Sequence, residues 1–271
     1  MIEIPLYQID AFTGRVFGGN PAAVCVLAKW LPDETMQAIA AENNLSETAF
    51  FVPSGDDYDL RWFTPATEVD LCGHATLATG ALVLSKLDPS RPSVRFHTAS
   101  GVLEVVKDGE WFAMDFPAWE AKSTKSTAVA DALGATPVEL LSNQRDYLAV
   151  FEKEVDIRTM TPDFEKLGKL ERPGMIVTAP GDKVDFVSRF FAPGLGIKED
   201  PVTGSAHCAL TPYWSKRLGK DTLNARQISA RGGELVCEQR GERVVMRGRV
   251  AFFLEGTIKV SASTTAAGAS T

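Results

Sequence analysis

One stretch of the sequence occurs twice, and it constrains the fold more than any other feature. Residues 61–78 read RWFTPATEVDLCGHATLA, and residues 189–209 read RFFAPGLGIKEDPVTGSAHCA. Each copy runs Arg, two aromatic residues, a small residue and Pro, then a polar loop, a Gly and a run of small residues. The copies start 128 residues apart (61 to 189), close to half of the 271-residue chain. Solenoid repeats are only about 20–50 residues long, so the spacing predicts one duplicated domain.

Each copy predicts a strand, a loop and a helix. Pro65 and Pro193 lack the N–H that a strand ladder needs, so they end the apolar strand before them. Gly73 and Gly204 then open small-residue helices, the second of which Pro212 is expected to distort early. The free N–H groups at a helix start attract anions. Two such starts brought together would bind a small carboxylate, although glycines that merely end loops are the alternative.

Composition describes an ordinary globular protein and excludes some partners. The chain is 45% hydrophobic and 23% charged, with a net charge of −7 and no Lys/Arg run, so nucleic acid and anionic membranes are not expected partners. The apolar runs are too short to span a bilayer, and the N-terminus lacks a positively charged region, so a cytoplasmic location is expected. Four widely spaced cysteines without a C-x-x-C pair indicate reduced thiols.

The rest of the chain predicts many strands and few helices. A helix is expected to begin at Pro32 and to end at Asn43-Asn44. The pattern predicts an α+β protein with two domains, residues 1–120 and 121–262, each with strands around a central helix. Residues 263–271 are expected to be a disordered tail. Apolar alternation and turn residues predict strands near residues 4–11, 22–27, 48–52, 93–98, 102–107, 111–116, 146–151, 174–178, 184–191, 226–230, 234–239, 242–247 and 250–260.

Two residues are candidates for acid/base chemistry. Glu47 stands between a helix end and the apolar run AFFV, where partial burial would raise its pKa and suit it to act as a general base near neutral pH. A solvated or capping Glu in the turn Ser46-Glu47-Thr48 is the alternative. His74 follows Gly73 at a helix start, where the helix dipole disfavours the imidazolium. A neutral His that contacts substrate is predicted there, or else a packed one.

Other polar residues of the repeats could contribute. Asp200 and Ser205, in EDPVTGSA, could bind substrate or orient Glu47, although an Asp before Pro is also a common turn residue. Cys72 could be a thiolate at a helix start, but a buried, unreactive thiol is the safer interpretation. No metal is expected, because the spacing of the four available thiol and imidazole groups fits no zinc pattern well: Cys72, His74, His207 and Cys208.

At these residues the sequence resembles the phenazine-biosynthesis (PhzF-like) isomerase family, which shares its fold with diaminopimelate epimerase and proline racemase. The resemblance covers nearly the whole chain: QIDAFTGRVFGGNPAAV, NNLSETAFF, the two repeated stretches and RGGEL from residue 231. It implies a duplicated diaminopimelate epimerase-like fold of two pseudo-symmetric domains, each a β-barrel-like sheet around a central helix. It also implies an active site between the halves, no cofactor, and a homodimer.

The resemblance also assigns roles. Glu47 falls on the family's catalytic acid/base, Gly73 and His74 on its GH pair, and Asp200 and Ser205 on its substrate-binding Asp and Ser. Catalytic roles are therefore expected for Glu47, His74 and Asp200, and substrate binding for Gly73, Gly204 and Ser205.

Three functions remain open at this point. The related epimerases and racemases use two catalytic thiols. The resemblance places Cys72 at the first of these positions and Thr203 at the second, so the second thiol is missing. The expected function is therefore a cofactor-independent isomerase that moves a proton on a small carboxylate. The alternatives are a racemase or epimerase that uses Cys72, and a non-catalytic protein that binds a small ligand.

Overall fold

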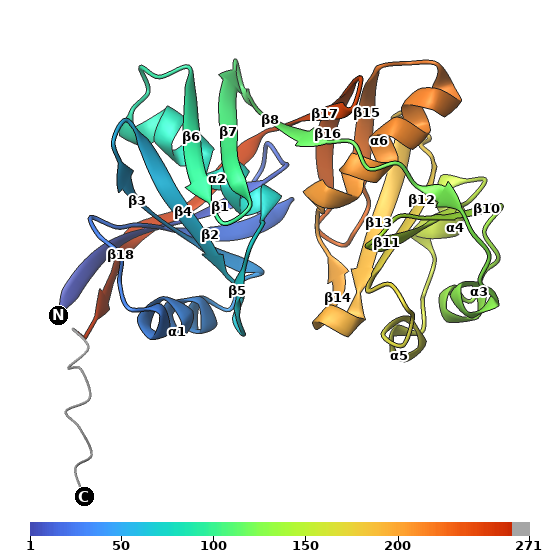
Figure 1. Cartoon of the computed structure of the whole chain (residues 1–271), viewed down its shortest axis with the longest axis horizontal. Helices are drawn as coiled ribbons and strands as arrows, with labels where there is room; N and C mark the ends of the chain where they lie inside the picture. The colour runs from blue at the N-terminus through green and yellow to red at the C-terminus, as the bar shows by residue number, and fades with distance from the viewer. Residues whose placement is uncertain (262–271) are drawn as a thin grey trace, which may run out of the picture.

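The computed structural model describes residues 1–261, which form two lobes side by side (Figure 1). The N-lobe contains β1 (Ile2–Ala11), β2 (Asn20–Val26), α1 (Asp33–Asn43), β3 (Glu47–Ser54), β4 (Asp57–Phe63), β5 (Glu68–Val69), α2 (Gly73–Leu82), a π-helical turn (Val83–Leu87), β6 (Ser93–Thr98) and β7 (Gly101–Asp108). The C-lobe contains β9 (Lys122–Ser123), α3 (Thr127–Leu133), β10 (Glu139–Ser142), β11 (Asp146–Val150), α4 (Glu154–Arg158), α5 (Phe164–Leu167), β12 (Gly174–Pro180), β13 (Phe186–Ala192), a 3₁₀ turn (Pro193–Leu195), β14 (Ile197–Asp200), α6 (Gly204–Leu218), β15 (Thr222–Gln227) and β16 (Gly233–Arg240).

Three further strands tie the lobes together. β8 (Trp111–Pro117) follows β7 and pairs antiparallel with β17 (Arg243–Gly248), which follows β16. β18 (Val250–Val260) then returns to the N-lobe and pairs with β1 along its whole length. The division into residues 1–120 and 121–262, and the duplication itself, stay predictions. The division assigns β18 to the second domain, whereas in the structure β18 pairs with β1 of the N-lobe.

Helix α2 lies at the centre of the N-lobe. Every α2 residue after Gly73 is buried, because the helix contacts β1, β2, β3, β7 and β8. Its polar members Thr76 and Thr79 satisfy their hydroxyl groups by donating to the carbonyl groups of Cys72 and Ala75. Gly80 allows the close approach of β7, since a Cβ there would lie 2.5 Å from the Cβ of Val105. The small-residue run that follows Gly73 therefore lets strands surround the helix.

Helix α6 has the corresponding place in the C-lobe and packs against β15, β16 and β17. Its Trp214 stacks on Phe186 and donates a hydrogen bond to the Thr178 hydroxyl group. Pro212 does not end the helix, which continues to Leu218. Because Pro212 has no N–H, the carbonyl group four residues earlier is left free. The backbone N–H of Trp119 donates to that carbonyl group, at Cys208, with a distance of 2.9 Å.

Most of the predicted elements are present, but one strand is misplaced. The strand predicted at 226–230 is β15, Thr222–Gln227. Its buried residues alternate as Leu223, Ala225 and Gln227, and the buried Gln concealed the apolar alternation on which the prediction depended. The predicted disordered tail lies outside the described residues. Within residues 1–261, no helix combines the length and the apolar character needed to cross a membrane.

Candidate active site

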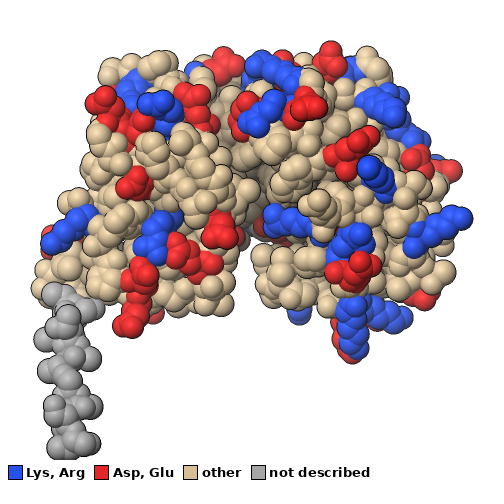
Figure 2. All heavy atoms as spheres, viewed as in Figure 1, with Lys and Arg blue, Asp and Glu red and all other residues tan. Residues whose placement is uncertain are grey.

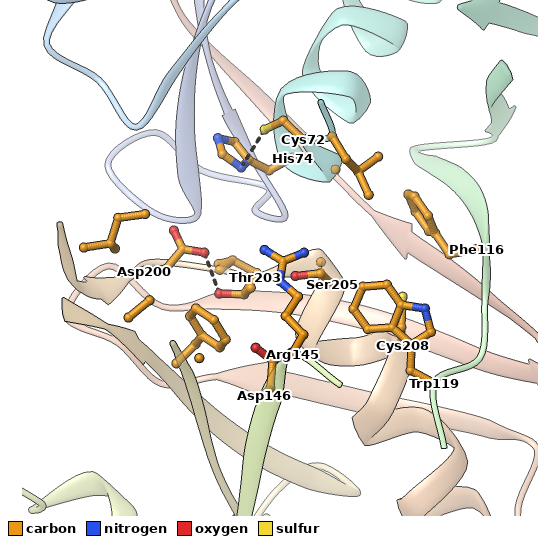
Figure 3. Close-up of a pocket in the computed structure, with 18 of the residues that line it drawn as sticks. Cys72, His74, Phe116, Trp119, Arg145, Asp146, Asp200, Thr203, Ser205 and Cys208 are labelled. Carbon is orange, nitrogen blue, oxygen red and sulfur yellow. Dashed lines mark hydrogen bonds between the residues drawn. The ribbon is translucent and has the colours of Figure 1, made fainter. Parts of the chain in front are cut away.

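The starts of α2 and α6 meet between the lobes. A Cβ built on Gly73 would lie 4.0 Å from the Cα of Gly204, and the reverse distance is also 4.0 Å. A cavity of about 160 Å³ opens beside this contact, and Figure 3 shows side chains of both lobes around it. All six predicted site residues line this cavity: Glu47, Gly73, His74, Asp200, Gly204 and Ser205.

The two glycines keep the space between the helix starts open. Neither backbone lies in the left-handed region, and a Cβ would meet its neighbours only at ordinary contact distance, so neither geometry requires Gly. A side chain at either position would instead reduce the space in front of the first N–H groups of the helices. The residues before them, Cys72 and Thr203, make no side-chain cap hydrogen bond. The arrangement can therefore present backbone donors and two helix dipoles to an anion.

Glu47 is the first residue of β3, and its side chain is only 14% exposed. Its Oε2 lies 3.2 Å from Nε2 of His74, although the two atoms do not have hydrogen-bond geometry. Burial raises the pKa of Glu47 to about 8; the charge of Asp200 adds to the rise and the Cys72 thiol opposes it. Near neutral pH both the protonated and the ionised forms of Glu47 are populated, which is what a group that takes and returns a proton needs.

His74 is the second residue of α2 and is buried. Burial lowers its pKa to about 4, against the opposing effect of the Pro21 carbonyl group. The imidazole is therefore neutral at physiological pH, with one nitrogen that donates and one that accepts. Its Nδ1 lies 3.3 Å from Nδ2 of Asn20 and 3.6 Å from the Cys72 sulfur. The other ring nitrogen, Nε2, is the one that lies 3.2 Å from the Glu47 carboxyl group.

Asp200 ends β14, and its side chain is held by two donors. Nδ2 of Asn20 donates to Oδ1 at 2.9 Å, and the Thr203 hydroxyl group donates to Oδ2 at 2.5 Å. Burial nevertheless raises the pKa of Asp200 to about 6. Asn20 also donates to the carbonyl group of Val202. Since Asn20 belongs to the N-lobe and its partners to the C-lobe, these hydrogen bonds fix the two helix starts relative to each other.

The Cys72 thiol is buried beside Glu47 and His74. Burial raises its pKa well above the ordinary value, and the charge of Glu47 adds to this, so the helix dipole does not make it a thiolate. Donor atoms of Glu47, Cys72 and His74 lie within 4.8 Å of one another, a set that a metal ion could use. A metal would require the ionised forms of Glu47 and Cys72, which burial disfavours. The expected absence of a metal stays a prediction.

The other two members of the metal set considered from the sequence lie apart from this group. His207 is buried on α6, with Nδ1 2.8 Å from the Thr203 carbonyl group. Cys208 lines the cavity further along α6, and burial raises its pKa to about 12.

Sequence reasoning missed several residues around the site. Gln227 accepts a hydrogen bond from the backbone N–H of Thr203 and donates to the backbone carbonyl group of Asp200. Arg145, Asp146 and Trp119 also line the cavity (Figure 3). Asn20 could have been singled out from the sequence, because it stands in the Gly-rich segment GGNP. The other four are single polar or aromatic residues outside any motif.

Known proteins resemble this chain along nearly its whole length. Residues 9–256 match the family PhzC-PhzF, whose description is phenazine biosynthesis-like protein. An uncharacterised isomerase of Pseudomonas aeruginosa is 52% identical over 258 residues, which are 95% of this chain and 99% of that protein. A crystal structure of a PhzF-family phenazine biosynthesis protein from Enterococcus faecalis superposes with a TM-score of 0.94 and 48% identity, over 96% of this chain and 100% of that one.

A more distant likeness bears on the fold alone. A probable proline racemase from Agrobacterium radiobacter has a TM-score of 0.62 at 11% identity, over 97% of this chain and 94% of that one. The mixed α/β architecture is therefore the epimerase-like fold expected from the sequence.

Proposed function

The chain belongs to the PhzC-PhzF family of phenazine biosynthesis-like proteins and is an isomerase, and we propose that it moves a proton between two carbons of a small carboxylate with Glu47 as the acid/base. The observation that carries this proposal is the environment of Glu47. Its carboxyl group is buried in the cavity between two helix starts, and its pKa is raised to about 8. No other carboxyl group with a raised pKa in residues 1–261 faces the ring of His74 in this way.

The helix starts at Gly73 and Gly204 hold the substrate carboxylate, because both line the cavity and neither is capped by a side chain. Glu47 in its ionised form then removes a proton from an adjacent carbon whose C–H is acidified by conjugation. With a pKa of about 8, part of the Glu47 population is ionised near neutral pH, which suffices for a base. The protonated form returns the proton at the second carbon. Backbone donors of these two helix starts stabilise the charge that develops between the two steps.

His74 and Asp200 assist Glu47 from two sides. The neutral ring of His74, 3.2 Å from Glu47, helps to position the carboxyl group and stays neutral while Glu47 changes its protonation state. Asp200 contributes negative charge that raises the pKa of Glu47. Its own position is fixed by Asn20 and Thr203. Ser205, on the first turn of α6, is placed to bind the substrate.

Two observations disfavour a racemase that works with Cys72. A symmetric racemase needs one group that removes the proton on one face and a second that returns it on the other. The Cys72 thiol holds its proton because of burial, and the resemblance to the epimerases and racemases places Thr203 at the position of the second thiol. A single carboxyl group that serves both steps needs neither thiol.

We also propose that the enzyme works without a cofactor and as a homodimer. Exposed apolar side chains on one surface support an interface between copies: Phe17 is 70% exposed, and it contacts the exposed Phe253 edge to face. On the face drawn in Figure 2, acidic and basic side chains are interspersed without a large area of one sign, in keeping with small molecules rather than nucleic acid as partners. Sedimentation velocity of the purified protein measures its oligomeric state.

Hydrogen exchange with solvent tests the reaction type. Small carboxylates with a C–H next to a conjugated double bond are incubated with the protein in D₂O and followed by NMR. The proposal predicts deuterium uptake, or an internally transferred proton, together with movement of the double bond. Deuterium at an inverted stereocentre without movement of a double bond would indicate the racemase. Ligand binding without exchange or isomerisation in any member of the series would indicate a non-catalytic binding protein.

A further inference from the structure

The segment that joins β14 to α6 is held at every residue by a side chain. It consists of residues 200–203 and carries the Asp200 carboxyl group. Each of its four backbone carbonyl groups accepts a hydrogen bond from a side chain, at 2.7 to 2.9 Å. The donors are, in order along the segment, Gln227, Ser229, Asn20 and His207. Because these side chains come from separate parts of the fold, the segment is fixed without belonging to a regular element.

Gln227 ties the two ends of this segment to each other. It is the last residue of β15 and is 0% exposed. Its Oε1 accepts a hydrogen bond from the backbone N–H of Thr203 at 2.9 Å, and its Nε2 donates to the carbonyl group of Asp200 at 2.7 Å. An amide side chain presents an acceptor and a donor next to each other. Gln227 therefore matches both ends at once, whereas a carboxylate or an amine would match only one of them.

The two ends that Gln227 holds also carry the side chains that act on Glu47. The Thr203 hydroxyl group donates to Oδ2 of Asp200 at 2.5 Å (Figure 3), and Nε2 of Gln227 lies 3.3 Å from the same hydroxyl oxygen. The charge of Asp200 in turn acts on Glu47. Within the part of the chain that the structure describes, Gln227 is not among the residues that line the cavity. Any effect that it has on Glu47 must pass through the segment that it holds.

We propose that Gln227 is a positioning residue, whose amide group fixes residues 200–203 and so keeps the Asp200 carboxyl group beside Glu47. The inference rests on the proposed function, in which Asp200 assists Glu47. A charge that acts on a proton-transfer group works best when it is held in place beforehand. Without the amide, the N–H of Thr203 and the carbonyl group of Asp200 would be left unpaired in a buried place, which is costly. The segment should then move to find other partners, and Asp200 should move with it.

The direction of the effect on Glu47 follows from the contacts of Asp200. A displaced segment takes the negative charge of Asp200 away from Glu47. It also loosens the Thr203 hydrogen bond that lowers the pKa of Asp200, so a smaller fraction of Asp200 is ionised. Both changes lower the pKa of Glu47, because the charge of Asp200 helps to raise it. The other titratable groups beside Glu47, His74 and Cys72, are neutral and do not oppose this change.

A titration of Glu47 itself tests the proposal without any substrate. The protein is labelled with ¹³C at the carboxyl carbons of glutamate and titrated by NMR from pH 5 to 10, and the Glu47 resonance is identified by its absence from Glu47→Gln. Gln227→Met keeps the approximate size of the side chain and removes its hydrogen bonds. In this variant the midpoint for Glu47 should move to lower pH by about one unit. An unchanged midpoint, or one that moves to higher pH, would overturn the proposal.

A matched control and a second variant accompany this measurement. Gln239 lies on β16 and also donates to a backbone carbonyl group, that of Gly241. Gln239→Met should leave the midpoint of Glu47 where it is in the wild type. Gln227→Asn keeps the amide but is one methylene group too short to reach both ends of the segment, so it should act in the same direction as Gln227→Met. It also repeats the test with a polar side chain if the Met variant does not fold.

A double substitution separates positioning from general loosening of the core. Asp200→Asn removes the charge of Asp200 and keeps the shape of its side chain. If Gln227 acts through Asp200, Gln227→Met should move the midpoint of Glu47 much less in the Asp200→Asn protein than in the wild type. A shift of the same size in both proteins would mean that Gln227→Met merely admits water to Glu47. That result would contradict the proposal.

The outcome is distinguishable from failure of the proposed function. If the Glu47 titration responds as predicted but no carboxylate is ever isomerised, the positioning of Asp200 by Gln227 stands and the isomerase mechanism fails. If isomerisation requires Glu47 but Gln227→Met leaves the Glu47 titration unchanged, the mechanism stands and the role of Gln227 fails.

Discussion

Replacing Glu47 by Gln should make the protein more stable, and increasingly so as the pH rises. Gln keeps the size of the side chain but cannot ionise. In the wild-type protein the pKa of Glu47 is about 8 in the folded state, against an ordinary value of 4.5. Between these two values the unfolded chain has lost a proton that the folded protein still holds. The free energy of unfolding of the wild type therefore falls as the pH rises through this interval.

The structure sets the size of the effect. Each pH unit in the interval is worth about 1.4 kcal/mol, so the whole interval corresponds to an upper limit of about 5 kcal/mol. Well below pH 4.5 the carboxyl group is neutral in both states, and Glu47→Gln should change stability little. At pH 8 to 9 the variant should exceed the wild type by roughly 3 to 5 kcal/mol. Such a gain would mean that the Glu47 carboxyl group lowers the stability of the folded protein.

Urea unfolding followed by tryptophan fluorescence measures the difference. The wild type, Glu47→Gln and the control Glu152→Gln are unfolded at pH 5, 6, 7, 8 and 9; Glu152 is exposed. The difference between Glu47→Gln and wild type should grow steadily with pH, whereas the control should show no such growth. A difference that is constant or that shrinks with pH would refute the raised pKa, and with it the environment on which the proposed mechanism depends.

Three further substitutions test the site and its frame. Cys72→Ala should leave turnover within about tenfold, equivalent to about 1.4 kcal/mol in barrier, because the thiol packs and does not react; a loss of several orders of magnitude with the fold intact would restore the racemase. Gly204→Ala should weaken binding of any carboxylate that the wild type isomerises at least tenfold, with little change in melting temperature, since its Cβ projects toward Gly73 at ordinary contact distance; unchanged binding would remove the helix starts from the anion site. Gly80→Ala should destabilise the fold by about 1–3 kcal/mol, and Val105→Ala should restore part of this, because the new Cβ would collide with Val105; the absence of rescue in thermal unfolding would contradict the packing argument.

The sequence predicted the features that local chemistry determines. A strand ended by Pro and a Gly that opens a small-residue helix are local patterns, so the positions of α2 and α6 followed from the repeated stretch. Their meeting at Gly73 and Gly204 followed from the repetition itself. Glu47 could be singled out because an acid beside AFFV is unusual in either a turn or a core.

What the sequence did not predict depends on packing between distant segments. Asp146 and Gln227 look like ordinary surface residues in the sequence, and only the fold shows that both are buried beside the cavity. Asn20 gains its role by reaching Asp200 in the other lobe. The return of β18 to β1 is equally hidden, because alternation predicts a strand but not its partner. These are contacts over long sequence distances, which periodicity does not encode.

The central claim is that Glu47 moves the proton, and the comparison of binding and chemistry in Glu47→Gln tests it most directly. For any carboxylate that the wild type isomerises, both the affinity and the rate of isomerisation at saturation are measured for the two proteins. The affinity should change by less than about threefold, because Gln keeps the size and hydrogen bonding of the side chain. The rate should fall by about 10²–10⁴-fold, the usual contribution of general acid–base catalysis. A variant that isomerises substrate at the wild-type rate would show that Glu47 is not the base.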